Sequence, residues 1–172
     1  MLAKSLKFYF RNLLKIKTKP MCYIICGFIG AGKSTYSRQL AQATGAVHLN
    51  VDEWCMKLFS KDEYERNWGI CFSKTVDYLW EKAYQYAQTK QSVIFDMGFW
   101  TKESRKNAFE KARKLGFVPQ VYYIYAPDVV LKERILKRGG LWAEYNLNNF
   151  DHIKQQFDEP NISEKYIKIE NF

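Results

Sequence analysis

The segment that decides the fold is Gly27-Phe28-Ile29-Gly30-Ala31-Gly32-Lys33-Ser34, which matches the phosphate-binding pattern G-x-x-x-x-G-K-S in full. Glycines in such a loop let backbone N–H groups turn towards a phosphate, the lysine reaches the β- and γ-phosphates, and the serine hydroxyl suits Mg²⁺. We therefore predict a nucleotide site formed by the Walker A residues Gly27, Phe28, Ile29, Gly30, Ala31, Gly32, Lys33, Ser34 and Thr35. Ser34 is also a predicted metal ligand.

The sequence on either side of this loop supports the same interpretation. The apolar run 21–26 precedes it and predicts a buried strand, and a helical pattern runs from Lys33 to Gly45. The helix N-terminus adds amide groups and a favourable dipole to an anion site. A glycine-rich turn that only connects a strand to a helix is the simpler alternative, but strand, loop, Lys-Ser and helix occur here in the order that the motif requires.

The rest of the chain alternates between predicted strands and predicted helices. Further strands are expected at 46–50, 93–95, 121–125 and 166–169, the last at an edge, and helices at 72–87, 101–115 and 127–138, with a linking region at 57–69. Thr101 is the predicted cap of the second of these helices. This alternation predicts an α/β P-loop three-layer sandwich with a parallel sheet of about five strands.

Two acidic residues are expected beside the phosphate loop. Asp52 and Asp96 each follow a predicted strand, and ligands bind at the carboxyl ends of the strands in such sheets. Asp52 suits the general base that accepts a hydroxyl proton, and Asp96 suits a Mg²⁺ role, direct or through water. The simpler alternatives are a helix cap for Asp52 and a strand-end turn for Asp96.

Two arginines complete the predicted site. Arg134 and Arg138 lie four residues apart on one face of the predicted helix 127–138 and suit the transferring phosphates, with solvated surface charges as the alternative. Met97, rather than a glutamate, follows Asp96, and no N-K-x-D run is present. These features favour a kinase over an ATPase or a switch GTPase. The predicted catalytic residues are therefore Asp52, Lys33, Arg134 and Arg138.

Four stretches, GFIGAGKST, HLNVDEW, VIFDMGFW and YYIYAPDVVLKERILKR, resemble a family of small P-loop kinases that includes zeta toxin, chloramphenicol phosphotransferase and the kinase domain of polynucleotide kinase. The resemblance covers about residues 21–140. It implies that Lys33 and Ser34 hold ATP and Mg²⁺, that Asp52 is the general base, and that both arginines belong to a lid. Polynucleotide kinases often have an arginine three residues after the catalytic aspartate, where this chain has Cys55.

The charge is concentrated at the start of the chain. The net charge is +9, but residues 1–20 contain six basic residues and no acid, which leaves 21 basic and 18 acidic residues in the remainder. That remainder is ordinary for a soluble domain and gives no footprint for nucleic acid. We predict a basic amphipathic N-terminal extension at 1–20 and a P-loop kinase domain at 21–172. The extension could contact a membrane surface weakly, form a disordered tail, or precede a true start at Met21.

The four cysteines lack C-x-x-C spacing and predict buried thiols in a reducing cytoplasm. No apolar segment is long enough to cross a bilayer. We expect a cytoplasmic, ATP- and magnesium-dependent kinase that phosphorylates a hydroxyl of a small molecule. Two alternatives stay open: a polynucleotide 5′-hydroxyl kinase, and a membrane-tethered ATP-binding module without transfer activity.

Overall fold

A computed structural model describes residues 19–172 of the chain. The basic extension was predicted at residues 1–20, and only Lys19 and Pro20 of it fall within this range. The amphipathic helix and the three alternatives for the extension therefore lie outside the described residues. None of the described helices is long and apolar enough to span a membrane.

The centre of the fold is a sheet of five parallel strands in the order β2-β3-β1-β4-β5, which confirms the predicted fold class. The central strands are apolar because helices cover both of their faces. In β1, four of the six residues are fully buried. The strands are β1 (Met21–Cys26), β2 (Val47–Asn50), β3 (Val93–Gly98), β4 (Val118–Tyr125) and β5 (Tyr166–Glu170).

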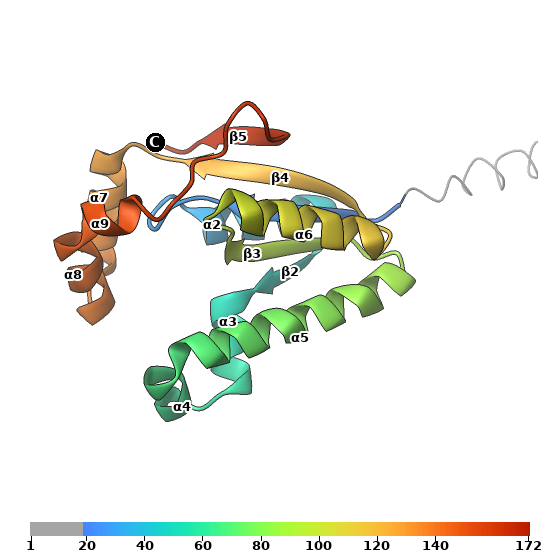
Figure 1. The fold of residues 1–172 in the computed structure, drawn as a ribbon, viewed down its shortest axis with the longest axis horizontal. Coiled ribbons are helices and arrows are strands. Elements are labelled where there is room, and N and C mark those ends of the chain that lie inside the picture. The colour runs from blue at the N-terminus through green and yellow to red at the C-terminus, as the bar shows by residue number, and fades with distance from the viewer. Residues whose placement is uncertain (1–18) are drawn as a thin grey trace, which may run out of the picture.

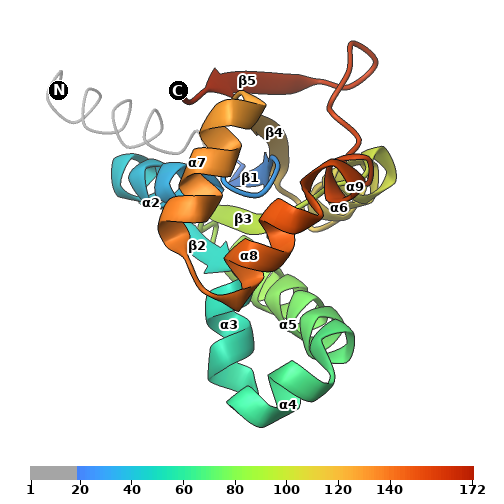
Figure 2. The same ribbon diagram turned by 90° about the vertical axis from the view of Figure 1, so that its left-hand side faces the viewer.

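The helices form two outer layers, and Figure 2 shows α2 and α6 on opposite sides of the sheet. One core joins α5 and α6 to the sheet, with the Trp80 and Phe95 rings 4.3 Å apart, and the other places Leu131 and Ile135 of α7 against Ile124 of β4. The described helices, labelled in Figure 1, are α2 (Lys33–Thr44), α3 (Val51–Leu58), α4 (Lys61–Arg66), α5 (Trp68–Gln88), α6 (Lys102–Lys114), α7 (Asp128–Arg138), α8 (Leu141–Asn148) and α9 (Phe150–Lys154).

Most predicted elements are present, and the differences have local causes. The linking region contains α4, whose N-terminus has a capping box between Ser60 and Glu63. That S-x-x-E spacing is readable from the sequence but lacks an apolar stripe to strengthen it. Thr101 caps α6 as predicted, with Ser104 as its partner. The stretch 141–165, for which no structure was predicted, contributes α8 and α9.

Two predictions about the acidic residues are wrong in detail. Asp52 follows β2 as predicted, since β2 ends at Asn50, and it lies in the first turn of α3. The alternative that Asp52 caps this helix is wrong, because the cap is Asn50. Asp96 lies inside β3, which continues to Gly98, so it occupies neither a strand end nor a turn. The strand β3 continues beyond Asp96 because Gly98 pairs with Cys26 of β1.

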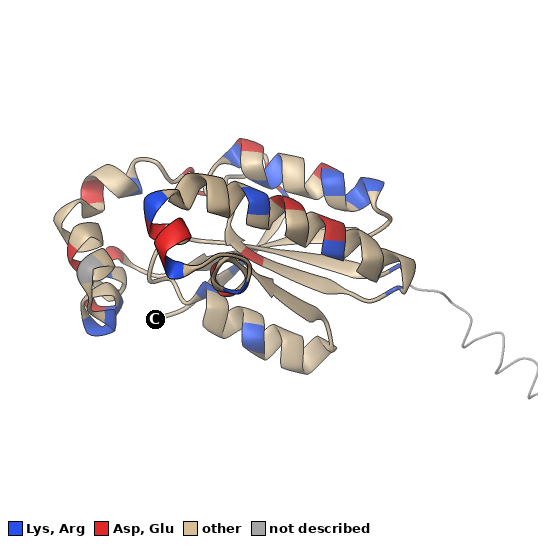
Figure 3. Ribbon diagram, turned by 90° about the horizontal axis from the view of Figure 1, so that it is seen from below, with Lys and Arg blue, Asp and Glu red and all other residues tan. Residues whose placement is uncertain are grey.

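Charged residues of both signs are mixed over the surface. In the view of Figure 3, the long helices α5 and α6 each carry both basic and acidic residues. This distribution agrees with the nearly balanced charge of residues 22–172.

Candidate functional site

The phosphate loop turns between β1 and α2 through three glycines with positive φ. Gly27, Gly30 and Gly32 have φ of 154°, 83° and 93°. A Cβ on Gly27 would lie 2.5 Å from the backbone oxygen of Ile124, and one on Gly30 would lie 2.9 Å from that of Leu131. Both approaches are backbone contacts that cannot yield easily, so the glycines are required by packing as well as by conformation. The three glycines therefore permit the backbone conformation that a phosphate-binding loop uses.

Lys33 begins α2 and folds back across the loop. Its Nζ donates a hydrogen bond to the backbone oxygen of Phe28 at 2.9 Å. Burial lowers its pKa, and the negative charges of Asp96 and Asp52 act in the opposite direction. Lys33 thus lies within electrostatic range of both predicted acids.

Asp96 is a buried carboxylate that already has polar partners. Its Oδ2 accepts a hydrogen bond from Asn50 Nδ2 at 2.7 Å and lies 3.2 Å from His48 Nε2. Burial alone would raise the pKa of Asp96, but hydrogen bonds from His48, Ser34 and Asn50 outweigh burial and lower it. The group is therefore held as an anion at neutral pH.

Asn50 connects Asp96 to the helix that carries Asp52. Its Nδ2 also lies 3.4 Å from Ser34 Oγ, while its Oδ1 accepts a hydrogen bond from the Glu53 backbone N–H at 2.8 Å. The hydrogen bond to the Glu53 N–H caps α3. Asn50 thus uses its amide oxygen to cap the helix and its amide nitrogen to bind Asp96. The side chain is 4% exposed.

Asp52 differs electrostatically from Asp96. Asp52 is exposed to solvent. Within residues 19–172, no side chain donates a hydrogen bond to its carboxylate. The pKa of Asp52 is raised, mainly because the surrounding protein desolvates the carboxylate and secondly because of the negative charge of Asp96. The positive charges of Lys33 and Arg138 lower this pKa by smaller amounts. Two carboxylates with pKa values displaced in opposite directions commonly divide acid–base and charge-stabilising roles.

The two arginines occupy different positions relative to the loop. Arg134 NH1 lies 3.4 Å from the Gly30 oxygen and 3.5 Å from the Ala31 oxygen, so it contacts the phosphate loop directly. Arg138 is exposed in the last turn of α7, and its charge reaches Lys33 and Asp52. The structure thus places Arg134 in contact with the phosphate loop and Arg138 on the exposed surface of the last turn of α7.

Sequence reasoning missed three polar residues of this region. Asn50 was detectable, because an asparagine three residues before Glu53 is a helix-start signal. His48 has no such signal. Asn171, after β5, donates from Nδ2 to the Ala31 oxygen at 2.7 Å, and its own backbone N–H bonds the Tyr125 oxygen at 2.8 Å. Only the strand order places it beside the phosphate loop.

The residues fit a nucleotide and a hard divalent cation. The loop is the glycine-rich turn before a helix N-terminus that binds phosphate in this motif, and Asn50 contacts both the Ser34 hydroxyl and the Asp96 carboxylate. Oxygen donors of these kinds are the ligands that Mg²⁺ prefers. The parallel sheet, the phosphate loop and the acids beside it define a P-loop kinase-like domain.

The chain belongs to a family of AAA domains, AAA_33, whose family model matches residues 23–160. Three solved structures share the fold. A sugar kinase from Janibacter sp. HTCC2649 aligns with a TM-score of 0.65 at 18% identity, over 88% of this chain and 85% of that one. APS kinase CysC from Mycobacterium tuberculosis, in complex with AMPPNP and APS, aligns with a TM-score of 0.63 at 16% identity, over 88% of each chain.

The PezAT chromosomal toxin–antitoxin system of Streptococcus pneumoniae aligns with a TM-score of 0.54 at 17% identity, over 90% of this chain and 68% of that one. At these identities the similarity concerns the fold. Together with the family match, it confirms the resemblance to small P-loop kinases.

Proposed function

We propose that the protein is a magnesium-dependent kinase that transfers the γ-phosphoryl group of ATP to a hydroxyl of a small molecule. The observation that carries this proposal is the pair of carboxylates beside Lys33. Asp96 is hydrogen-bonded and has a lowered pKa, whereas Asp52 has a raised pKa and accepts no hydrogen bond from a side chain within residues 19–172. A carboxylate with a raised pKa and unused oxygens is suited to accept a proton from an attacking hydroxyl.

Each residue then has a separate task in the proposed reaction. Residues 27–35 bind the phosphates through backbone N–H groups, and Lys33 neutralises charge on the β- and γ-phosphates. Ser34 and Asp96 would hold Mg²⁺, which supplies further neutralisation of phosphate charge when bound. Asp52 takes the acceptor's proton, and Arg134 and Arg138 stabilise charge on the group in transfer.

The environment of Cys55 supports a small acceptor over a polynucleotide. Cys55 occupies the position where polynucleotide kinases often have an arginine, and it is fully buried with Sγ 3.1 Å from Thr75 Oγ1. A residue in the core between α3 and α5 cannot hold a nucleic-acid phosphate. All four cysteines are free and buried, which supports the proposed cytoplasmic location.

ADP formation in the presence of a panel of hydroxyl compounds tests the proposal. The panel should contain sugars, nucleosides and aminoglycosides, together with a 5′-hydroxyl oligonucleotide, and Lys33→Ala serves as the inactive control. We expect one class of small hydroxyl compound to stimulate ADP formation and to appear as a phosphate monoester in ³¹P NMR spectra. Stimulation by the oligonucleotide alone would contradict the proposed acceptor, and failure to bind ATP would contradict the kinase.

A further inference from the structure

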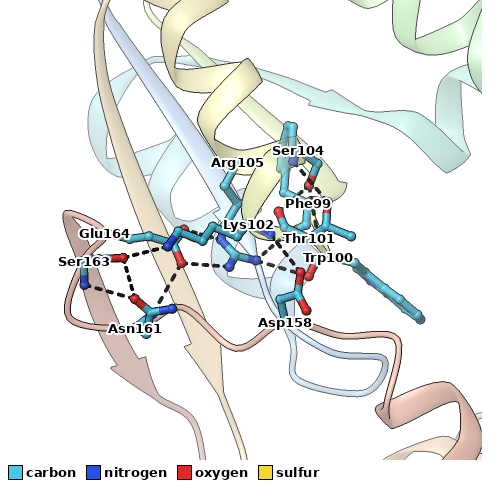
Figure 4. A network of polar contacts seen from close by, with 10 residues as sticks. All are labelled: Phe99, Trp100, Thr101, Lys102, Ser104, Arg105, Asp158, Asn161, Ser163 and Glu164. Atoms are coloured by element: carbon cyan, nitrogen blue, oxygen red, sulfur yellow. Dashed lines mark hydrogen bonds and ion pairs between the residues drawn. The ribbon is translucent and has the colours of Figure 1, made fainter.

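Arg105 is a buried charge on the opposite side of the sheet from α2. It is 1% exposed, and its Nε and NH2 donate to the two carboxylate oxygens of Glu164 at 2.7 and 2.9 Å. Its NH1 donates to the backbone oxygens of Phe99 and Trp100 at 3.1 and 3.2 Å (Figure 4). A buried guanidinium is tolerated only when its donors are satisfied. Here they tie together two loops that lie far apart in the sequence.

The loop that Arg105 holds has a rarely adopted backbone conformation. Phe99 has a φ of 43°, although it is not glycine, and Gly98 before it has a φ of 89°. A Cβ on Gly98 would lie 3.0 Å from the indole of Trp100. Such conformations persist only where the surrounding structure holds them. The Asp158 backbone N–H provides a further hold, since it donates to the Trp100 oxygen at 2.9 Å.

The held loop contacts the phosphate loop through two rings. Trp100 and Phe28 have ring centroids 5.5 Å apart, and Phe28 is 3% exposed. The backbone oxygen of Phe28 is the acceptor of the Lys33 Nζ hydrogen bond. A continuous set of contacts therefore runs from Glu164 through Arg105 and Trp100 to Phe28 and Lys33.

We propose that Arg105 and Glu164 are positioning residues of the nucleotide site, which hold Trp100 against Phe28 and so set the conformation of the phosphate loop. The inference rests on the proposed function only in that ATP occupies this loop. The proposed effect is indirect, since Arg105 acts through Trp100 and Glu164 acts through Arg105.

The same segment reaches the phosphate loop at a second point. Glu164 precedes β5, and Asn171, which follows β5, donates to the Ala31 oxygen. The C-terminal segment 158–171 thus contacts the loop through Trp100 on one side and through Asn171 on the other. A substitution of Glu164 should therefore change the conformation of the phosphate loop, although no residue of that loop is replaced.

The test is the affinity for AMPPNP and Mg²⁺, measured by calorimetry below the unfolding temperature of every variant. We expect Arg105→Lys, Glu164→Gln and Trp100→Ala each to weaken binding roughly 2- to 30-fold. Trp100→Phe, which keeps an aromatic ring against Phe28, should recover most of the loss. Glu65→Gln, which removes an exposed ion pair on α4, is the control and should bind as the unmodified chain does.

A double variant separates positioning from simple stabilisation. If Arg105 acts through Trp100, Arg105→Lys combined with Trp100→Ala should bind about as weakly as the weaker single variant, because contacting residues are not additive. Additive losses, or unchanged affinity in folded Arg105 and Glu164 variants, would overturn the inference. If the Arg105 variants fail to fold, the comparison of Trp100→Ala with Trp100→Phe decides: equal affinity in these two would overturn it as well. Absence of AMPPNP binding by the unmodified chain would instead overturn the nucleotide site itself.

Discussion

Asn50 donates a hydrogen bond to Asp96 at 2.7 Å with one end of its amide and caps the helix that begins at Val51 with the other. The residue thus fixes two acids at once: Asp96 directly, and Asp52 through the start of α3. Both contacts are made by groups of the protein itself, and they join the start of α3 to β3.

Substitution of Asn50 should separate its two roles. Asn50→Asp keeps a cap oxygen but replaces the donor to Asp96 with a second buried carboxylate, so we expect a lower melting temperature and a changed dependence of AMPPNP binding on Mg²⁺. Asn50→Ala loses the cap as well and should destabilise the protein by about 0.5–2 kcal/mol. Thermal unfolding and calorimetry with and without Mg²⁺ are the measurements. Unchanged Mg²⁺ dependence in Asn50→Asp would remove Asn50 from the metal site.

Asp52→Asn tests the proposed base. The amide keeps the shape but cannot accept the proton, so turnover should fall by about 10² to 10⁴-fold while ATP affinity hardly changes. Because desolvation raises the pKa of Asp52 and only the ionised form is a base, wild-type turnover should rise with pH through a value above the ordinary 3.8. The variant should lack that rise. If Asp52→Asn leaves turnover intact and Asp96→Asn abolishes it, the wrong acid has been assigned.

Lys33→Ala tests the phosphate loop. Lys33 is half-buried and contacts the loop rather than the core, so the variant should fold, lose most of its AMPPNP affinity and show no transfer. Circular dichroism checks the fold and calorimetry checks the affinity. Equal affinity in the variant and the wild type would show that the loop does not bind the nucleotide as proposed.

The two arginines should respond differently to substitution. Arg134 contacts the loop oxygens of Gly30 and Ala31, so Arg134→Ala should weaken nucleotide binding and lower turnover. Arg138 lies exposed at the rim, so Arg138→Ala should lower turnover more than affinity, as expected for a charge used in the closed state. Steady-state kinetics with the acceptor give both quantities. A normal kcat in Arg138→Ala would show that Arg138 is a solvated surface charge with no role in the transfer step.

Removal of residues 1–18 tests the division of the chain. Within the described residues, contact with the sheet begins at Pro20, whose oxygen accepts a hydrogen bond from the Val118 N–H at 2.8 Å, and β1 begins at Met21. We therefore expect a chain that starts at Lys19 to keep its nucleotide affinity and its melting temperature. A fall of more than a few degrees would show that the extension packs on the domain.

Several elements were predictable because their signals are local. The run 21–26, the glycines of the phosphate loop and the helix from Lys33 each follow from short-range sterics and hydrophobic patterning. The boundaries around the acids were not predictable to the residue. Whether β3 stops at Asp96 or continues to Gly98 depends on the ladder with β1, which lies about 70 residues away in the sequence.

The sequence by itself determined the phosphate loop, the alternation of strands and helices, and the position of Asp52 just after β2, because each depends on neighbours within a few residues. Tertiary structure alone decided the strand order, and with it the approach of Asn50 to Asp96, of Asn171 to Ala31, and of Glu164 to Arg105. These contacts join residues 46, 140 and 59 positions apart. The physical reason is that a buried polar group is stable only with a partner, and the packed sheet, rather than any local pattern, selects which partner is within reach.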